Sequence, residues 1–273
     1  MKNILKTIIL ILFVSFAACD DFIEVDPIGP DADDYFNSEE EYESALIGAY
    51  DLLQASFWNV LSGVVASDDY AAGGDTFTED QPTLQNINRM THSPADENQL
   101  RDIWNLMYAG INRTNYLLEF KNKTEFEGKD EIIAQAYFLR AYYYFELVKW
   151  FGDVPFAVDK RIQFGDQFEI VRTPKAQIYA QMEDDLIYAA ANLPYTQSEK
   201  GRITKGASLA LLGKVYLYQN KNTQAAAELA AVNGTPGGTS QYGYRLLTNF
   251  GDLWTVNNKF NTKSILEVAH TNA

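Results

Sequence analysis

The sequence predicts a mainly α-helical protein, built from packed helix pairs that long loops interrupt. Three observations support this fold class. Apolar residues recur every three or four positions over residues 134–151, and again over residues 205–229. Residues that commonly cap helices, Ser38 and Thr204, precede two periodic stretches. Proline and glycine separate these stretches, and a strand-like pattern is confined to the last residues.

Composition indicates a folded protein and excludes some partners. Hydrophobic residues make up 47% of the chain and aromatic residues 14%, with 17 Tyr and 4 Trp. Such a surplus of Tyr and Trp is typical of recognition surfaces. The net charge of −15 argues against nucleic-acid binding, which needs a basic surface. With one cysteine and two histidines, neither an intramolecular disulfide nor a Cys- or His-rich metal site is expected.

The N-terminus has the pattern of a lipoprotein signal. Lys2 and Lys6 precede an apolar run over residues 8–14, which is too short to span a bilayer. Small residues then lead directly to Cys19. We expect cleavage before Cys19 and a lipid on its thiol, the alternative being an ordinary secretory signal. The predicted organisation is a signal peptide over residues 1–18, a tether over 19–30 and a helical domain over 31–273.

The first predicted helix runs from Glu39 to about Gln54. Ser38 and Glu41 form a capping-box pattern ahead of it. Helical periodicity then fails over residues 57–93, which predicts a long loop, and loops of that length are often functional. Aromatic rings stack on sugar faces, while short polar and charged side chains bind hydroxyls. The candidate ligand-binding residues are therefore Trp58, Asp68, Asp69, Tyr70, Asn86 and Arg89, the alternative being that they pack the loop against helices.

Two long helices should follow this loop. One begins at Ser93 with Pro94 in its first turn, and places Trp104 in the core and Asn115 as a satisfied buried amide. The next, over residues 134–151, is apolar nearly all round and must be buried among other helices; Gly152 ends it. Arg140 on its apolar surface is expected to pair with a carboxylate rather than a ligand.

The remaining residues predict two further helices and a strand. Thr173 and Pro174 have the pattern of a cap and first position of a helix that ends before Pro194. After Thr204, Gly213 and Tyr216 have tetratricopeptide-like spacing, in which glycine admits a partner helix. The glycines of residues 233–238 do not follow a strand, which argues against a phosphate loop. Residues 264–269 are expected to form a strand.

Several of these stretches resemble the SusD/RagB family. They are Phe138 to Val148, Phe151 to Pro155, the spacing of Trp104, Tyr108, Ile111, Asn115 and Leu118, and the short patterns at residues 172–174 and 193–194. The resemblance implies a tetratricopeptide-like, SusD-like fold and a cell-surface lipoprotein without cofactor or catalysis. Such proteins hold an oligosaccharide or other nutrient beside a TonB-dependent, SusC-like outer-membrane transporter. Family members are about twice as long, so we expect the domain to be incomplete at its C-terminus.

Two other functions remain open at this point. A helical-repeat scaffold would bind protein through the helix pairs and have no ligand site of its own. A glycoside hydrolase would need two carboxylates across a cleft. Acidic pairs such as Asp68–Asp69 and Asp184–Asp185 are expected by chance in so acidic a chain, and we find no complete catalytic constellation. The sequence does not identify the ligand, the transporter or the oligomeric state.

Overall fold

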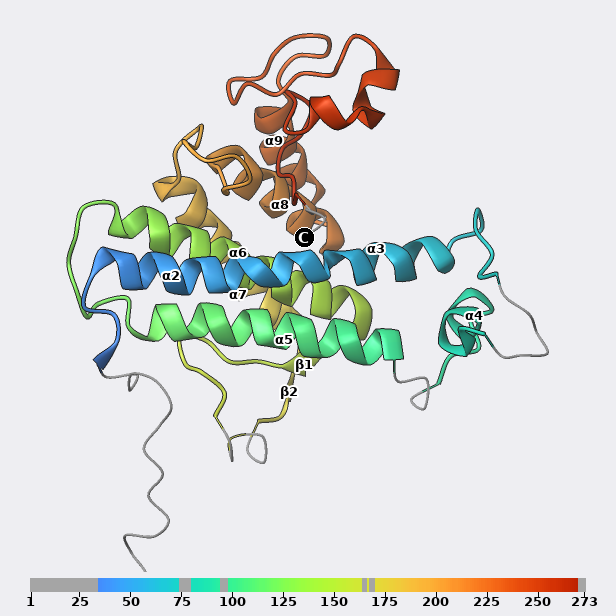
Figure 1. Ribbon diagram of the computed structural model, residues 1–273, viewed down its shortest axis with the longest axis horizontal. Coiled ribbons are helices and arrows are strands. Elements are labelled where there is room, and N and C mark those ends of the chain that lie inside the picture. The colour runs from blue at the N-terminus through green and yellow to red at the C-terminus, as the bar shows by residue number, and fades with distance from the viewer. Residues whose placement is uncertain (1–33, 74–79, 94–97, 164–165, 167–169, 270–273) are drawn as a thin grey trace, which may run out of the picture. The chain divides into compact units, whose positions relative to one another are not determined.

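The computed structural model describes residues 34–73, 80–93, 98–163, 166 and 170–269. The chain divides into two units, Met1–Asn37 and Ser38–Ala273. The predicted signal peptide, Cys19 and the tether lie outside the described residues. The second unit is helical, with one short sheet (Figure 1). Its helices are α2 (Glu39–Tyr50), α3 (Ser56–Val65), α4 (Pro82–Asn88), α5 (Asn98–Glu119), α6 (Lys129–Phe151), α7 (Lys175–Asn192), α8 (Lys205–Tyr218) and α9 (Asn222–Asn233).

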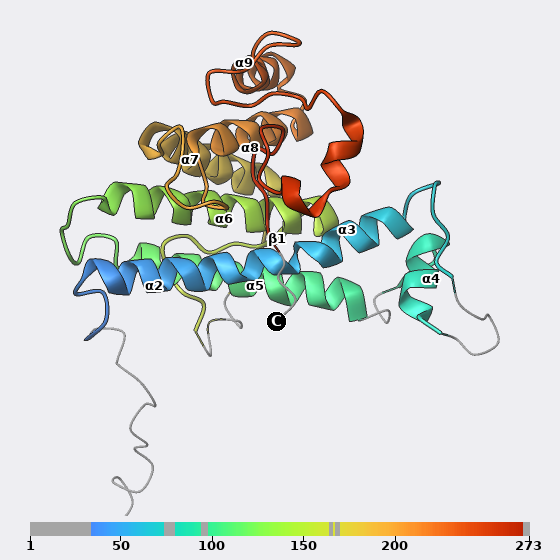
Figure 2. The same ribbon diagram turned by 45° about the horizontal axis from the view of Figure 1, so that its top comes forward.

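Helix α6 is the central element of this unit. It packs against α2, α5 and α7, and almost every side chain from Ile132 to Val148 is buried. Gly152 follows with φ +71°, so the helix ends where the sequence predicts. A helix that is apolar all round needs neighbours on every side, and Figure 2 shows α6 between α2 and α5 on one side and α7 and α8 on the other. The predicted all-α class and the burial of this helix are confirmed.

Arg140 is fully buried on α6 and bonds to α5, to α7 and to the segment between α6 and α7. Its guanidinium donates to both carboxylate oxygens of Asp185 on α7, at 2.8 and 2.7 Å. One nitrogen also donates to Asp159 at 2.5 Å and to the Asn115 amide oxygen on α5 at 3.1 Å. The Asn115 amide nitrogen donates to the Ala157 carbonyl. The structural roles predicted for Arg140 and Asn115 are confirmed.

Asp159 fastens the irregular segment between α6 and α7 to the helices. Burial by itself raises the pKa of this carboxyl, but hydrogen bonds from Lys121 and Arg140 outweigh burial and hold the pKa below its usual value. The short antiparallel strands β1 (Val154–Pro155) and β2 (Arg172–Thr173) bracket the segment, with Val154 opposite Thr173. Charge on Asp159 therefore stabilises the fold.

A lowered folded-state pKa gives stability that is present above the unfolded pKa and is lost as the pH falls through the folded value. We therefore expect the free energy of unfolding to decrease as the pH falls below about 4. Asp159→Asn should remove part of that decrease, because an amide does not titrate. Urea unfolding of both proteins across this pH range tests the expectation. Equal pH dependence in the two proteins would show that Asp159 does not contribute.

The helices form successive pairs, as the sequence predicts. α6 packs on α7, α7 on α8, and α8 on α9. Gly213 on α8 admits α9, since a Cβ atom at this position would lie 2.7 Å from the Leu229 side chain. The Thr204 side chain caps α8 by accepting from the Ala207 amide at 3.3 Å.

The structure corrects the predicted cap of α7, and it confirms that α2 starts at Glu39 after Ser38. Pro174 rather than Thr173 occupies the cap position of α7, because Asp153 accepts from the Lys175 amide at 2.9 Å and Thr173 belongs to β2. Ser38 does stand at the cap of α2, but its side chain accepts no hydrogen bond from the first turn. The predicted start of the following long helix at Pro94 lies outside the described residues, and α5 is described from Asn98.

Two predicted segments are wrong. The loop predicted over residues 57–93 is interrupted by helices, since α3 extends to Val65 and α4 follows later. A 3-10 helix (Asp51–Ala55) continues α2, which the sequence predicts to run to about Gln54, into α3. Residues 264–269 form no strand, because their backbone has no partner strand in the described residues; turns and side-chain contacts hold this region instead. The carbonyl of Thr262 accepts from the Arg245 amide at 2.8 Å, for example.

Candidate functional site

Helices α3 and α4 lie at the end of the bundle away from the start of α2 (Figures 1 and 2). α3 packs on α4 and α5. Its inner face buries Val65, and its outer face exposes Phe57 and Val60. The buried side of α3 also carries the polar residues Asn59 and Ser62, so its apolar residues do not mark the side that packs on the other helices. We call residues 66–73, together with α4 and Arg89, which follows it, the α3–α4 segment.

Two side-chain amides of α4, the buried Gln85 and the half-buried Asn88, hold the backbone of this segment. The Asn88 side chain donates to the carbonyl of Val65 at 2.8 Å and to that of Tyr70 at 2.9 Å. The Gln85 side chain donates to the carbonyl of Asp80 at 2.8 Å and to that of Gly73 at 3.4 Å. α4 therefore anchors the chain that follows α3, through Val65, Tyr70 and Gly73, and the residue Asp80 just before α4. These anchors position the exposed side chains between them.

The structure places five of the six predicted ligand residues on the α3–α4 segment. Asp68, Asp69 and Tyr70 follow α3 directly and are exposed, with Tyr70 at 64% of its full area. Asn86 is half-buried on α4, and Arg89 is exposed at the C-terminal end of this helix. The Asn88 amide joins the Tyr70 backbone to α4, so these five residues belong to one locally fixed surface.

Trp58 stands apart from the other five. It lies near the start of α3, seven residues before the helix ends, which corresponds to about 10 Å along the axis. Its half-buried ring contacts Phe57, with centroids 5.6 Å apart in an edge-to-face arrangement. Trp58 could therefore reach the same ligand as Tyr70 only if the ligand extends along α3.

Beside this segment lies a pocket of about 690 Å³ that the sequence did not predict. We call it the aromatic pocket. It is lined by Ala66, Ile87, Met90, His92, Ser93, Leu100, Arg101, Trp104, Trp150 and Phe151. Its lining comes from the ends of α3, α4, α5 and α6. Trp104 packs edge-to-face on Phe151 with centroids 5.1 Å apart.

Its helical spacing predicts that Trp104 is a core residue, whereas in the structure it also lines this pocket. The ring is half-buried, because the neighbouring turns at the ends of α4 and α6 do not cover it completely. No local signal in the sequence indicates this, since the pocket depends on how four helix ends meet. The nearest signal is the concentration of Trp and Phe at the ends of two helices, Trp104 on α5 and Trp150 and Phe151 on α6.

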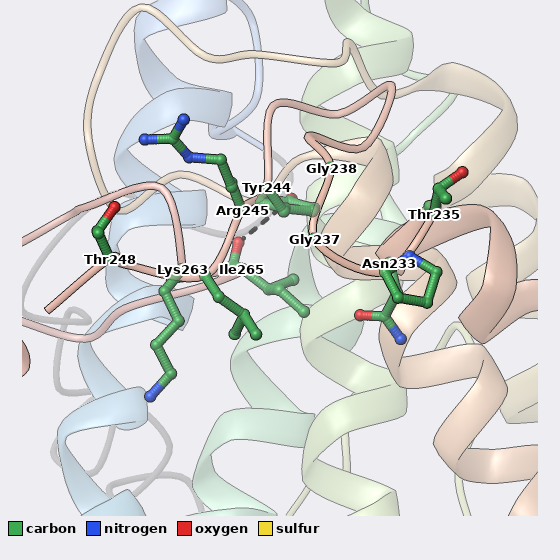
Figure 3. A pocket seen from close by; sticks show the side chains of 12 residues that line it. Asn233, Thr235, Gly237, Gly238, Tyr244, Arg245, Thr248, Lys263 and Ile265 are labelled. Atoms are coloured by element: carbon green, nitrogen blue, oxygen red, sulfur yellow. Dashed lines mark hydrogen bonds between the residues drawn. The ribbon is translucent and has the colours of Figure 1, made fainter. Parts of the chain in front are cut away.

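A second cavity, of about 380 Å³, lies among the C-terminal turns (Figure 3). The glycine-rich residues 233–238, Tyr244, Arg245 and Lys263 line it. The loop follows the C-terminal end of α9, where Gly234 adopts φ +67°. A helix C-terminus presents carbonyl oxygens and partial negative charge, which disfavours an anion. The geometry therefore agrees with the sequence in giving no phosphate loop here.

The described residues offer little for catalysis or metal binding. Asp185, one member of an acidic pair noted above, is 2% exposed and is held by Arg140, so it is not available to a substrate. Within the described ranges, no three His, Cys, Asp or Glu side chains converge on a point that could hold a metal ion. Of the helices that the structure describes, none is both long and apolar enough to cross a membrane.

The sequence and the fold are both similar to known proteins. Residues 21–217 match the model of the SusD-like family described as starch-binding and associating with the outer membrane. This chain belongs to the SusD-like family. A laminarin-binding SusD-like protein of known structure is 42% identical, with a TM-score of 0.80, over 87% of this chain and 52% of that one.

SusD-like relatives likewise align with nearly all of this chain but with only half of their own length. SusD-like protein P2 of Formosa agariphila is 27% identical over 92% of this chain and 50% of its own length. A SusD-like protein of Bacteroides ovatus is 28% identical over 97% of this chain and 50% of its own length. The chain therefore spans about half the length of these SusD-like relatives.

Proposed function

We propose that this SusD-like protein binds a glycan at the cell surface without chemical change and passes it to a TonB-dependent, SusC-like transporter of the outer membrane. The observation that supports glycan binding most strongly is the 42% identity to a laminarin-binding protein over 87% of this chain. Laminarin is consequently the first glycan to test. The lipid predicted on Cys19 would anchor the protein to the outer membrane.

The α3–α4 segment is the surface that we assign to the glycan. Tyr70 offers an exposed ring for stacking on a sugar face. Asp68, Asp69 and Arg89 are exposed beside it and supply acceptors and donors for hydroxyl groups. Because Asn88 and Gln85 fix the backbone beneath these residues, the site would need little ordering on binding.

Native affinity electrophoresis against a polysaccharide panel that includes laminarin tests this function. We expect at least one glycan to retard the purified protein, and the Trp58→Ala/Tyr70→Ala variant to be retarded less. Retardation without any difference in the variant would place the glycan elsewhere on the molecule. If no glycan retards the protein, the function of this chain reduces to the helical-repeat scaffold considered above.

The transporter partnership needs its own experiment. We expect the lipidated protein to copurify from outer membranes with a TonB-dependent transporter, and a Cys19→Ala variant to be lost from the membrane fraction. A Cys19→Ala variant that remains in the membrane to the same extent would contradict lipid anchoring. Purification of the native protein without any such transporter would contradict the partnership.

A further inference from the structure

The aromatic pocket has the chemistry of a ligand site rather than of a packing defect. Its volume of about 690 Å³ falls in the range of small-molecule sites. Two indole rings and a phenyl ring line it, with His92, Ser93 and Arg101 as the polar side chains. Among the described residues that line it, none is a carboxylate. Rings for stacking are thus combined with nitrogen donors that suit hydroxyl groups.

The pocket is continuous with the α3–α4 segment along the chain. Ala66 in its lining stands two residues before Asp68, and Met90 follows Arg89 directly. Ile87, which also lines it, lies between Asn86 and the anchoring Asn88 on α4. The pocket and the predicted ligand residues are therefore built on the same short stretches of chain, so one extended ligand could contact both.

Polar groups without partners surround this junction of helices. The Trp150 indole nitrogen is buried and has no acceptor among the described residues, and its ring lines the pocket. The Ser62 hydroxyl and the Asn59 amide on α3, and the Gln99 amide oxygen on α5, are likewise buried without a hydrogen bond. Buried polar groups ordinarily have partners. Of these residues, Trp150 lines the pocket, so its indole nitrogen is a donor that an oxygen of a bound molecule could satisfy.

We propose that the aromatic pocket is a second saccharide subsite, which takes a neutral hexose ring from the same glycan that the α3–α4 segment binds. This inference rests on the proposed function and extends it from one surface to two joined subsites. Trp104 supplies the stacking face, and Arg101 and His92 bind ring hydroxyls. A glycan long enough to occupy both subsites binds more tightly than a short one.

Isothermal titration calorimetry with laminarihexaose and laminaribiose tests the proposal. The pocket variant is Met90→Ala/Arg101→Ala, since both side chains are exposed and their removal leaves the core intact. We expect it to bind laminarihexaose about fivefold to tenfold more weakly than the unmodified protein does. The control is Lys175→Ala/Leu217→Ala, which removes the same kinds of exposed side chain from α7 and α8 and should bind normally.

Tryptophan emission gives a second readout that general destabilisation would not reproduce. We expect laminarihexaose to change the emission of the unmodified protein, and the change to be smaller in Trp104→Phe at saturating sugar. The pocket is not a subsite if laminarihexaose binds the pocket variant and the unmodified protein equally. Absence of binding by the unmodified protein would instead contradict the proposed function for this glycan, and the two failures are thereby distinguished.

Discussion

Replacement of Arg140 by methionine is expected to lower the free energy of unfolding by about 3–5 kcal/mol. The substitution leaves the Asp185 carboxylate 2% exposed without its two hydrogen bonds from the guanidinium. It also removes one of the two cations that bind Asp159, so the segment between α6 and α7 loses one attachment to α6 and keeps the hydrogen bonds between Tyr144 and Ala157. At about 2–4 °C per kcal/mol for a chain of this size, the melting temperature should fall by roughly 6–20 °C.

Arg113→Met is the matched control for Arg140→Met. Arg113 pairs with Asp51, but both side chains are about half exposed. Exposed ion pairs contribute at most about 1 kcal/mol. Chemical denaturation of the two variants should therefore separate them clearly. Equal destabilisation would mean that burial of the Arg140 network has no special effect.

The double variant Arg140→Met/Asp185→Leu probes the same network in another way. It removes both charges, so no buried carboxylate is left without a partner. We expect it to be more stable than Arg140→Met alone, although Asp159 still lacks the guanidinium. The single variant Asp185→Leu completes the comparison. If the double variant loses as much stability as Arg140→Met and Asp185→Leu lose together, the two residues are not coupled.

The second large effect is expected at Gly110 on α5. A Cβ atom there would lie 2.6 Å from the ring of Tyr143 on α6. That ring is fully buried, and its hydroxyl donates to the Ala49 carbonyl on α2 at 2.6 Å, so it is held at both ends. Overpacking of this kind costs about 1–3 kcal/mol. Gly110→Ala should destabilise the fold despite the better helix propensity of alanine.

Gly63→Ala provides a control of opposite sign. Gly63 is exposed within α3, and no atom lies within 4 Å of the Cβ position. Alanine should therefore stabilise the protein by about 0.5–1 kcal/mol through helix propensity. Thermal unfolding of the two variants should give shifts in opposite directions. A stabilised Gly110→Ala variant would show that α5 and α6 are farther apart than described here.

The parts of the fold that the sequence predicted well are those where one residue satisfies several requirements. The apolar surface of α6 requires helices on all sides, and Arg140 within it requires a carboxylate, which Asp185 supplies. Gly213 requires a closely packed helix, which α9 supplies. Such requirements can be recognised from a short stretch of sequence, so they identify the central helices before any contact between helices is known.

The missed parts depend on contacts between distant residues. In α3 the exposed side carries Phe57 and Val60 while the buried side carries polar Asn59 and Ser62, so hydrophobicity does not indicate which side packs on the protein. Residues 264–269 have strand-forming composition, but a strand needs a partner, and turns hold these residues instead. The aromatic pocket forms where the ends of four helices meet, which periodicity does not report.

Retardation of this protein in a laminarin-containing native gel, compared between Tyr70→Ala and Tyr195→Ala, tests the central claim most directly. Both tyrosines are more than half exposed, and only Tyr70 belongs to the α3–α4 segment. We expect the unmodified protein and Tyr195→Ala to be retarded alike, and Tyr70→Ala to migrate nearly as it does without glycan. Equal retardation of all three proteins would contradict a glycan site on the α3–α4 segment.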